Sequence, residues 1–242
     1  MPTLPRAIEP FVDRVENDGF AILPGAVDAN GIASLVETVE RFRHESPTPR
    51  GAGIRNLLRA VPEVEALAAS RTIRRLVEPI LGAGAFPARG ILFDKTPSGN
   101  WKVPWHQDLT IAVSRRVETP GFGPWTVKDG VHHVQPPTEI LEQMLAVRIH
   151  LDDCGETNGP LRVIPGTHRR GRMTSSQIQE LQKSQVSISC LLPRQGVILM
   201  RPLLLHASSA ATSPAHRRVI HIEYAATELP GNLCWHSRQG CP

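Results

Sequence analysis

Residues 105–108 read Trp-His-Gln-Asp, and their spacing decides how the rest of the chain is interpreted. Side chains two apart on a β-strand point to the same side, so His106 and Asp108 can converge on one point. A second histidine, His206, follows an apolar run far along the chain. Two imidazoles and one carboxylate form the facial triad that holds Fe(II) and leaves its other coordination positions open. The three residues therefore predict an iron site that joins two distant segments of one β-fold.

A second His-x-Asp triplet, at residues 150–152, competes for the same role. His150 ends an apolar run, and Asp152 opens a turn that continues with Asp, Cys and Gly. An aspartate at the start of a turn commonly accepts hydrogen bonds from the nearby backbone. This triplet is therefore interpreted as an end-of-strand histidine and a turn residue, and the first pair is favoured as iron ligands.

Arg217 and Arg218 stand at the start of another apolar strand, after His206. Alternation along the strand lets only one of the two arginines face inward, and the spacing from His206 favours Arg217. A guanidinium binds a carboxylate through two parallel hydrogen bonds, which suits an acidic cosubstrate. The triad and Arg217 together predict an Fe(II) oxygenase with 2-oxoglutarate and O2 as cosubstrates.

The chain changes character near residue 86. Residues 1–85 have helical spacing, with Asp28 as a predicted N-cap and Pro62 as a predicted first helical residue. Residues 86–228 alternate short apolar runs with turn residues, which is typical of a β-core. The pattern predicts an α+β fold over 1–242, with N-terminal helices flanking a double-stranded β-helix, or jelly roll. Expected helices cover 8–17, 28–43, 63–69, 72–81 and 177–183, and expected strands cover 20–23, 90–94, 101–106, 144–151, 161–164, 197–201 and 218–224.

Residues 114–138 are rich in Gly, Pro and His and are predicted to form a long irregular loop. Loops of this length in compact domains often act as lids over binding sites. The lid candidates on this segment are Phe122, Trp125, His132 and His133. Adjacent residues of an extended chain point to opposite faces, so the two histidines are not expected to share a metal.

Composition places the chain among ordinary globular proteins, with 40% hydrophobic and 21% charged residues. The net charge of +4 is spread along the sequence, so no nucleic-acid surface is expected. The same mild excess of basic residues favours an acidic small molecule as substrate.

The cysteine pattern and the N-terminus bear on location. Four cysteines form no Cys-x-x-Cys pair and are expected to be free thiols of a cytoplasmic protein. The first 16 residues contain charges and prolines but no apolar core of a signal peptide, and no apolar run approaches membrane-spanning length. We expect a soluble monomer or homodimer with no membrane partner.

Several segments in the same order resemble the phytanoyl-CoA dioxygenase (PhyH) family. They are residues 93–97, 105–108, 151–153, 158–168 and 206–217. The resemblance covers most of the chain and implies a double-stranded β-helix with flanking helices. It implies that His106, Asp108 and His206 bind the iron, and no catalytic side chain beyond the metal centre is expected.

The resemblance also implies a cosubstrate site. Arg217 matches the arginine that binds the distal carboxylate of 2-oxoglutarate, and Ser208 matches a residue that touches the same cosubstrate. Trp125 and Ile91 match a tryptophan and an apolar residue beside it. Arg55 falls where the family can place a pocket residue.

Three further basic residues lie on expected strands and are candidates to face inward: Lys102, Arg148 and Arg162. Together with Arg55 they are the tentative substrate-binding residues. Several inward arginines would suit a substrate that bears a carboxylate.

The implied reaction is hydroxylation of an unactivated C–H bond of a small molecule, with release of succinate and CO2. Related halogenases replace the carboxylate ligand with a small residue, whereas Asp108 is present here, so hydroxylation is favoured over halogenation. The family spans acyl-CoA, amino-acid, ectoine-like and secondary-metabolite substrates, and the sequence does not select among them.

Three alternative functions are weighed against this prediction. A cupin-like metal-dependent hydrolase or isomerase would usually place its ligands closer together, with more histidines. A non-catalytic small-molecule-binding jelly roll would be expected to lack one ligand or the arginine. An oxygenase that repairs nucleic acid would be expected to carry a basic stretch interleaved with aromatic residues, which is absent here.

Overall fold

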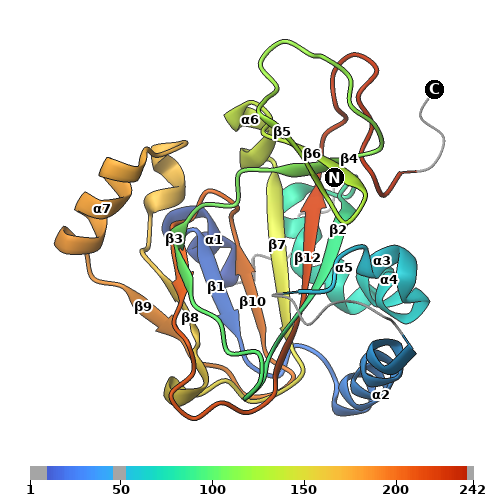
Figure 1. Cartoon of the computed structure of the whole chain (residues 1–242), viewed down its shortest axis with the longest axis vertical. Helices are drawn as coiled ribbons and strands as arrows, with labels where there is room; N and C mark the ends of the chain where they lie inside the picture. The colour runs from blue at the N-terminus through green and yellow to red at the C-terminus, as the bar shows by residue number, and fades with distance from the viewer. Residues whose placement is uncertain (1–9, 46–52, 239–242) are drawn as a thin grey trace, which may run out of the picture.

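Two antiparallel β-sheets face each other in the computed structural model, which describes residues 10–45 and 53–238 (Figure 1). The larger sheet has the strand order β1 (Phe20–Leu23), β10 (Val197–Met200), β7 (Met144–His150), β12 (Arg217–Ala225) and β2 (Phe86–Lys95). The smaller sheet has the order β3 (Val103–His106), β11 (His206–Ser208), β8 (Leu161–Val163) and β9 (Ile188–Cys190). Neighbours in both sheets are distant in sequence, as in the predicted jelly roll.

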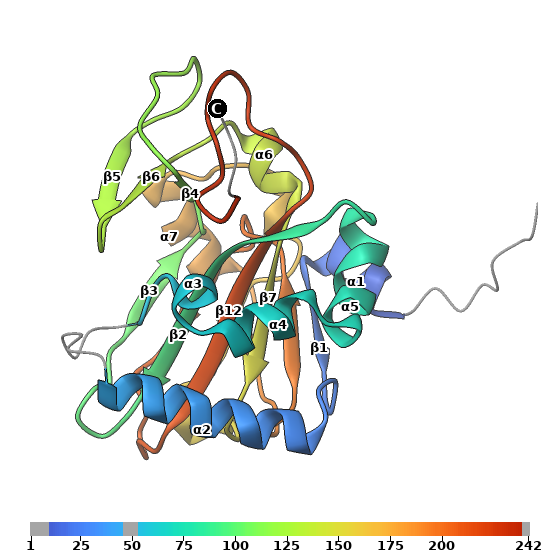
Figure 2. The same cartoon turned by 90° about the vertical axis from the view of Figure 1, so that its right-hand side faces the viewer.

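Five helices come from the N-terminal part of the chain and lie beside the larger sheet (Figure 2). They are α1 (Pro10–Asp18), α2 (Ala29–Glu45), α3 (Leu57–Ala60), α4 (Pro62–Ala69) and α5 (Arg71–Leu81). The predicted start signals are confirmed, because Asp28 Oδ1 accepts from Gly31 N at 2.7 Å and Pro62 is the first residue of α4.

The larger sheet separates an apolar layer from a polar interior. On β12, Ile220, Ile222 and Tyr224 pack with the helices in the main hydrophobic cluster. The alternate residues 217, 221 and 223 line an internal cavity instead. Because side chains alternate along a strand, the residues that anchor the helices also fix the direction of this polar row.

The smaller elements include one departure from the sequence-based prediction. Residues 114–138 are not a wholly irregular loop, since β5 (Trp125–Lys128) and β6 (Val131–Val134) pair within them and β4 (Ile111–Val113) completes a third sheet. The turn between β5 and β6 is Asp129-Gly130, with φ of 50° and 76°. An Asp-Gly pair with positive φ closes a two-residue hairpin, so residues 125–134 form two paired strands instead of irregular loop. The other elements are α6 (Thr138–Glu142), α7 (Ser175–Ser184) and the short 3-10 helices Glu156–Asn158 and Thr167–Arg170.

The described cysteines differ in their bonding state. Cys154 and Cys190 are buried free thiols, as predicted, whereas Cys234 is disulfide-bonded, so the expectation of a free thiol is wrong for Cys234. Within residues 10–45 and 53–238, no helix combines the length and apolar character needed to cross a membrane.

Candidate metal centre and cosubstrate pocket

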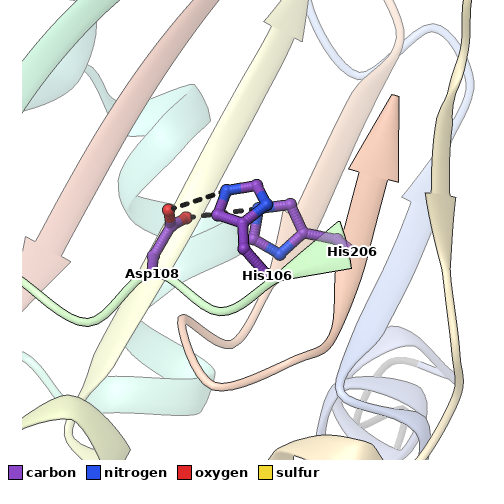
Figure 3. A group of neighbouring side chains, drawn as sticks. All are labelled: His106, Asp108 and His206. Atoms are coloured by element: carbon purple, nitrogen blue, oxygen red, sulfur yellow. Dashed lines mark ion pairs between the residues drawn. The ribbon is translucent and has the colours of Figure 1, made fainter. Parts of the chain in front are cut away.

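His106, Asp108 and His206 meet between the two sheets. His106 ends β3 and lies opposite His206 of β11 in the antiparallel pairing, so one strand pair presents both rings side by side. Their ring centroids are 4.2 Å apart. Asp108 Oδ1 lies 3.7 Å from His106 Nε2, and Asp108 Oδ2 lies 3.6 Å from His206 Nε2 (Figure 3). One ligand atom from each residue falls within 4.8 Å of the other two, so the three can share one metal ion.

Backbone hydrogen bonds orient both rings. His106 Nδ1 is 2.9 Å from the carbonyl oxygen of Pro104, and His206 Nδ1 is 2.8 Å from that of Leu204. A carbonyl oxygen only accepts, so each Nδ1 carries the proton and each Nε2 lone pair is free toward Asp108. Burial alone would raise the pKa of Asp108, but the two histidines hold it well below its usual range. An ionised carboxylate with two free imidazole nitrogens fits Fe(II).

The competing triplet at residues 150–152 is not part of this cluster. Asp152 accepts hydrogen bonds from the backbone and guanidinium of Arg218. His150 is buried, and neither of its ring nitrogens has a hydrogen-bond partner.

Arg217 and Ser208 lie at the other end of the same cavity. The Arg217 side chain is buried, and its Nη1 donates to the carbonyl of Gly159 and lies 3.4 Å from Ser208 Oγ. Its Nε has no partner. Arg217 therefore keeps an unused donor for an acidic ligand.

Lys95 is a second buried cation beside Arg217 and Ser208, and it is not among the residues predicted from the sequence. It lies opposite Arg217 in the pairing of β12 with β2. Its Nζ donates to Ser208 Oγ at 2.8 Å and to the carbonyl of Ser209. Burial, with Arg217 adding to the effect, lowers the pKa of Lys95 to about 8.

One cavity of about 130 Å³ connects the two ends. The three triad residues line it, as do Ser208, Arg217, Ile91 and Arg148. An engineered cavity of about 150 Å³ holds benzene, so this space suits a molecule of a few heavy atoms. The three triad residues and Arg217 therefore face the same small, partly open cavity.

Trp125 is not brought to this cavity. Its side chain packs at the edge of a separate hydrophobic cluster, and the Arg116 guanidinium lies 5.6 Å from its ring centroid. The predicted place beside the cosubstrate is therefore not supported, because Trp125 belongs to the β4–β6–β5 sheet rather than to the jelly-roll interior.

Three of the four tentative substrate residues also lie outside the cavity lining. Arg55 pairs with Asp129 at 2.9 Å, and the Arg162 guanidinium lies 5.3 Å from the ring centroid of Trp105. Lys102 is exposed and lies one residue before β3, which begins at Val103. The pairing of β3 with β11 also contains a register shift. The expectation that Lys102 lies on a strand and faces inward is therefore not supported.

A polar chain across the cavity wall was not predicted. Glu223 accepts from Arg89 and lies 3.3 Å from His221 Nε2. His221 Nδ1 lies 2.9 Å from Arg148 Nη1. His221 and Glu223 could have been found by counting every second residue along β12 from Arg217, because that face was already assigned inward.

Comparisons with known proteins bear on this geometry. Residues 15–219 match the family Phytanoyl-CoA dioxygenase (PhyH). The ectoine dioxygenase of Bordetella bronchiseptica is 25% identical over 256 residues, covering 90% of this chain and 75% of that protein. AviO1 from Streptomyces viridochromogenes Tue57 has a similar structure, with a TM-score of 0.67, 23% identity and coverage of 96% of this chain and 99% of that chain. The epimerase SnoN, solved with Fe3+, alpha ketoglutarate and nogalamycin RO, has a TM-score of 0.70, 15% identity and coverage of 98% and 95%.

The match from residue 15 to residue 219 includes the triad, Ser208 and Arg217. It confirms the predicted fold and the predicted dioxygenase class, and the iron and alpha ketoglutarate of the SnoN complex are the cofactor and cosubstrate expected from the sequence. The chain belongs to the phytanoyl-CoA dioxygenase (PhyH) family.

Proposed function

We propose that the chain is an Fe(II)- and 2-oxoglutarate-dependent dioxygenase that hydroxylates an unactivated C–H bond of a small molecule. His106, Asp108 and His206 would hold the iron, and Arg217 would bind the distal carboxylate of 2-oxoglutarate. The observation that carries the proposal is that the three triad residues and Arg217 line one cavity. Family membership and the similarity to an ectoine dioxygenase support it.

Bound iron supplies oxygen activation coupled to decarboxylation of 2-oxoglutarate, which yields succinate and CO2. The protein supplies ligation, orientation and exclusion of water. The backbone carbonyls behind the two histidines keep each Nε2 aimed at the metal position. Arg217 and Ser208 fix the far end of the cosubstrate through charge-assisted hydrogen bonds.

The chain's own residues favour hydroxylation and leave the substrate open. Asp108 keeps the carboxylate ligand that halogenases of this kind lack, so no position is vacated for a halide. The similarity to an ectoine dioxygenase supports a small-molecule substrate. An acidic substrate stays a prediction, because Arg148 is the only one of the four tentative substrate residues that lines the cavity.

The first experiment is an anaerobic titration of iron-free protein with Fe(II) and then 2-oxoglutarate, followed through the visible charge-transfer band. His206→Ala and Arg217→Ala serve as controls. The charge-transfer band should appear in the wild-type protein and be absent from His206→Ala. In Arg217→Ala it should require far higher concentrations of 2-oxoglutarate. This pattern would support the proposed site. Succinate release in a substrate screen would then test turnover.

The opposite result has a defined meaning. If the folded protein binds iron but gives no band with 2-oxoglutarate, the oxygenase proposal fails. A cupin-like hydrolase or isomerase, or a non-catalytic small-molecule-binding jelly roll, would then be the better explanation of the site.

A further inference from the structure

Arg148 is a buried cation that has no carboxylate within ion-pair distance among the described residues. It lies on the inner face of β7 and is 7% exposed. Its Nη1 faces the ring nitrogen Nδ1 of His221 at 2.9 Å, and its Nε has no partner. Burial of a guanidinium without an anion is costly, so the ligand-free protein keeps this group at a cost to its stability.

The position of Arg148 follows from the register of the larger sheet. Arg217, Val219 and His221 succeed one another on the inner face of β12, and Phe93 lies opposite Val219. The Arg148 guanidinium lies 5.4 Å from the Phe93 ring centroid and contacts His221. Arg148 itself lies opposite His221 in the pairing of β7 with β12, and its guanidinium extends across β12 to Phe93.

His221 marks the metal end of the cavity. Ligand atoms of Asp108, His221 and Glu223 fall within 4.8 Å of one another. The Arg148 guanidinium thus lies next to the metal end of the cavity, on the side that continues towards Arg217, and it lines the cavity that connects the two. A molecule that reaches from the metal to Arg217 must pass beside it.

The chain of hydrogen bonds behind Arg148 holds it in place. Glu223 accepts from Arg89 and, through the His221 Nε2 proton, from His221. This arrangement leaves the His221 Nδ1 lone pair to accept from Arg148. The Glu223 carboxylate is already paired with Arg89, so it does not neutralise Arg148 directly.

We propose that Arg148 is a second carboxylate-binding residue of the cavity and that it binds 2-oxoglutarate together with Arg217. This proposal rests on the proposed function above and changes the tentative assignment of Arg148 from substrate to cosubstrate. Two carboxylates on one small molecule match two separate guanidinium groups facing one small cavity. The anion would supply the partner that Arg148 lacks within the protein.

The test uses Arg148→Met, which removes the charge while keeping a long flexible side chain, and Arg148→Lys, which keeps the charge. Arg162→Met is the matched control, because Arg162 is a strand arginine outside the cavity lining. Dissociation constants are measured on anaerobic Fe(II)-loaded protein for 2-oxoglutarate and for 2-oxopentanoate, which lacks the distal carboxylate. Thermal melting of the ligand-free, metal-free proteins is the second readout.

We expect Arg148→Met to weaken 2-oxoglutarate binding at least about 30-fold, with partial recovery in Arg148→Lys and a change within about twofold in Arg162→Met. The melting temperature of ligand-free Arg148→Met should equal or exceed that of the wild type, because an uncompensated buried charge is removed. If the loss persists with 2-oxopentanoate, Arg148 binds the oxo-acid end, and if it disappears, Arg148 binds the distal carboxylate.

Unchanged 2-oxoglutarate affinity in Arg148→Met would overturn this inference. The inference would also be overturned if Arg148→Met lowered the melting temperature and Arg148→Lys did not recover the affinity for 2-oxoglutarate. That combination would indicate a purely structural role for Arg148. A wild-type protein that binds iron but not 2-oxoglutarate would instead overturn the proposed function, so the two failures are distinguishable.

Discussion

Lys95 and Arg217 lie opposite each other on adjacent strands, and both side chains reach the hydroxyl of Ser208. Two buried cations therefore stand side by side at Ser208, where Arg217 and Ser208 line the cavity and Lys95 contacts Ser208 from outside the lining. Their mutual repulsion is unfavourable in the ligand-free protein, and a bound carboxylate would relieve it. The pair predicts that this end of the cavity is built for an anion and that Lys95 contributes to its affinity.

Replacing Lys95 with Met should weaken 2-oxoglutarate binding about tenfold, because one positive charge and the donor to Ser208 are lost. Burial, reinforced by Arg217, lowers the pKa of Lys95 to about 8. Lys95 is therefore protonated below that pH and neutral above it. Wild-type affinity should fall as pH rises through 8 to 9, and Lys95→Met should lack this fall. The titration of the Fe(II) protein at pH 7 and 9 measures both effects.

Lys102→Met is the matched control, because Lys102 is exposed, whereas Lys95 is buried and bonded to Ser208. It should leave the affinity and its pH dependence unchanged. Equal affinity of Lys95→Met and wild type at pH 7 would contradict the role given to Lys95.

Substitutions of the neighbouring residues Arg217 and Arg218 should have different effects, one mainly on 2-oxoglutarate affinity and the other mainly on stability. Arg217→Met should weaken 2-oxoglutarate binding about 100-fold and should cost less unfolding free energy than Arg218→Met, because it removes the bond to the Gly159 carbonyl but breaks no ion pair within the described residues. Arg218→Met should lower the free energy of unfolding by about 1–3 kcal/mol, because Asp152 and Glu40 lose the guanidinium that they share. Urea unfolding and 2-oxoglutarate titration are measured on both variants. If Arg218→Met instead lost affinity for 2-oxoglutarate and Arg217→Met instead lost stability, the assignment of Arg217 as the inward residue would be wrong.

Position 159 has no room for a side chain larger than that of glycine. Its φ is +61°, and a β-carbon there would lie 2.6 Å from the Ser209 carbonyl oxygen and 3.0 Å from Lys95 Nζ. Its carbonyl accepts from Arg217 and Ser208. Gly159→Ala should therefore lower the free energy of unfolding by about 1–3 kcal/mol and also weaken 2-oxoglutarate binding.

Gly155→Ala provides the comparison, since a β-carbon at Gly155 would meet nothing within 4 Å and its φ is −86°. Gly155→Ala should change neither the free energy of unfolding nor the affinity for 2-oxoglutarate measurably. If Gly159→Ala behaved like Gly155→Ala in urea unfolding and in the titration, the carbonyl of Gly159 would not be an anchor of the site.

The sequence predicted the residues whose spacing follows regular strands. His106 and His206 were placed together by motif and resemblance. Alternation allowed only one of Arg217 and Arg218 to face inward, and the spacing from His206 favoured Arg217. Lys102 was expected on a strand over 101–106, but β3 starts two residues later, at Val103, and its pairing with β11 shifts register. Trp125 was misplaced because its segment forms a separate small sheet, which a local pattern does not position relative to the core.

Arg89, Lys95 and Glu223 illustrate a different limit. Their types and strand positions are visible in the sequence, but their partners are set by pairing between strands far apart in the chain. Lys95 meets Arg217 only because β2 pairs with β12. Single-sequence reasoning fixes the face of a strand well, whereas the neighbour across the sheet depends on topology and register.

His150 should make the protein sensitive to acid. Burial, with Arg148 and Arg217 nearby, lowers its pKa to about 3, and neither ring nitrogen has a hydrogen-bond partner. The unfolded chain takes up a proton near pH 6.5, whereas the folded protein does so only near pH 3, so stability falls as pH drops between these values. His150→Leu should remove this contribution, which is at most about 1.4 kcal/mol per pH unit.

The measurement is urea unfolding of wild type and His150→Leu at pH 7, 5.5 and 4.5. At pH 7 the variant should already be at least as stable, because an unsatisfied polar ring is replaced by an apolar side chain. The gap should widen at each lower pH. His44→Leu, a change on the exposed face of α2, controls for simple loss of a histidine. A constant gap across the three pH values would show that His150 is not held neutral by its surroundings.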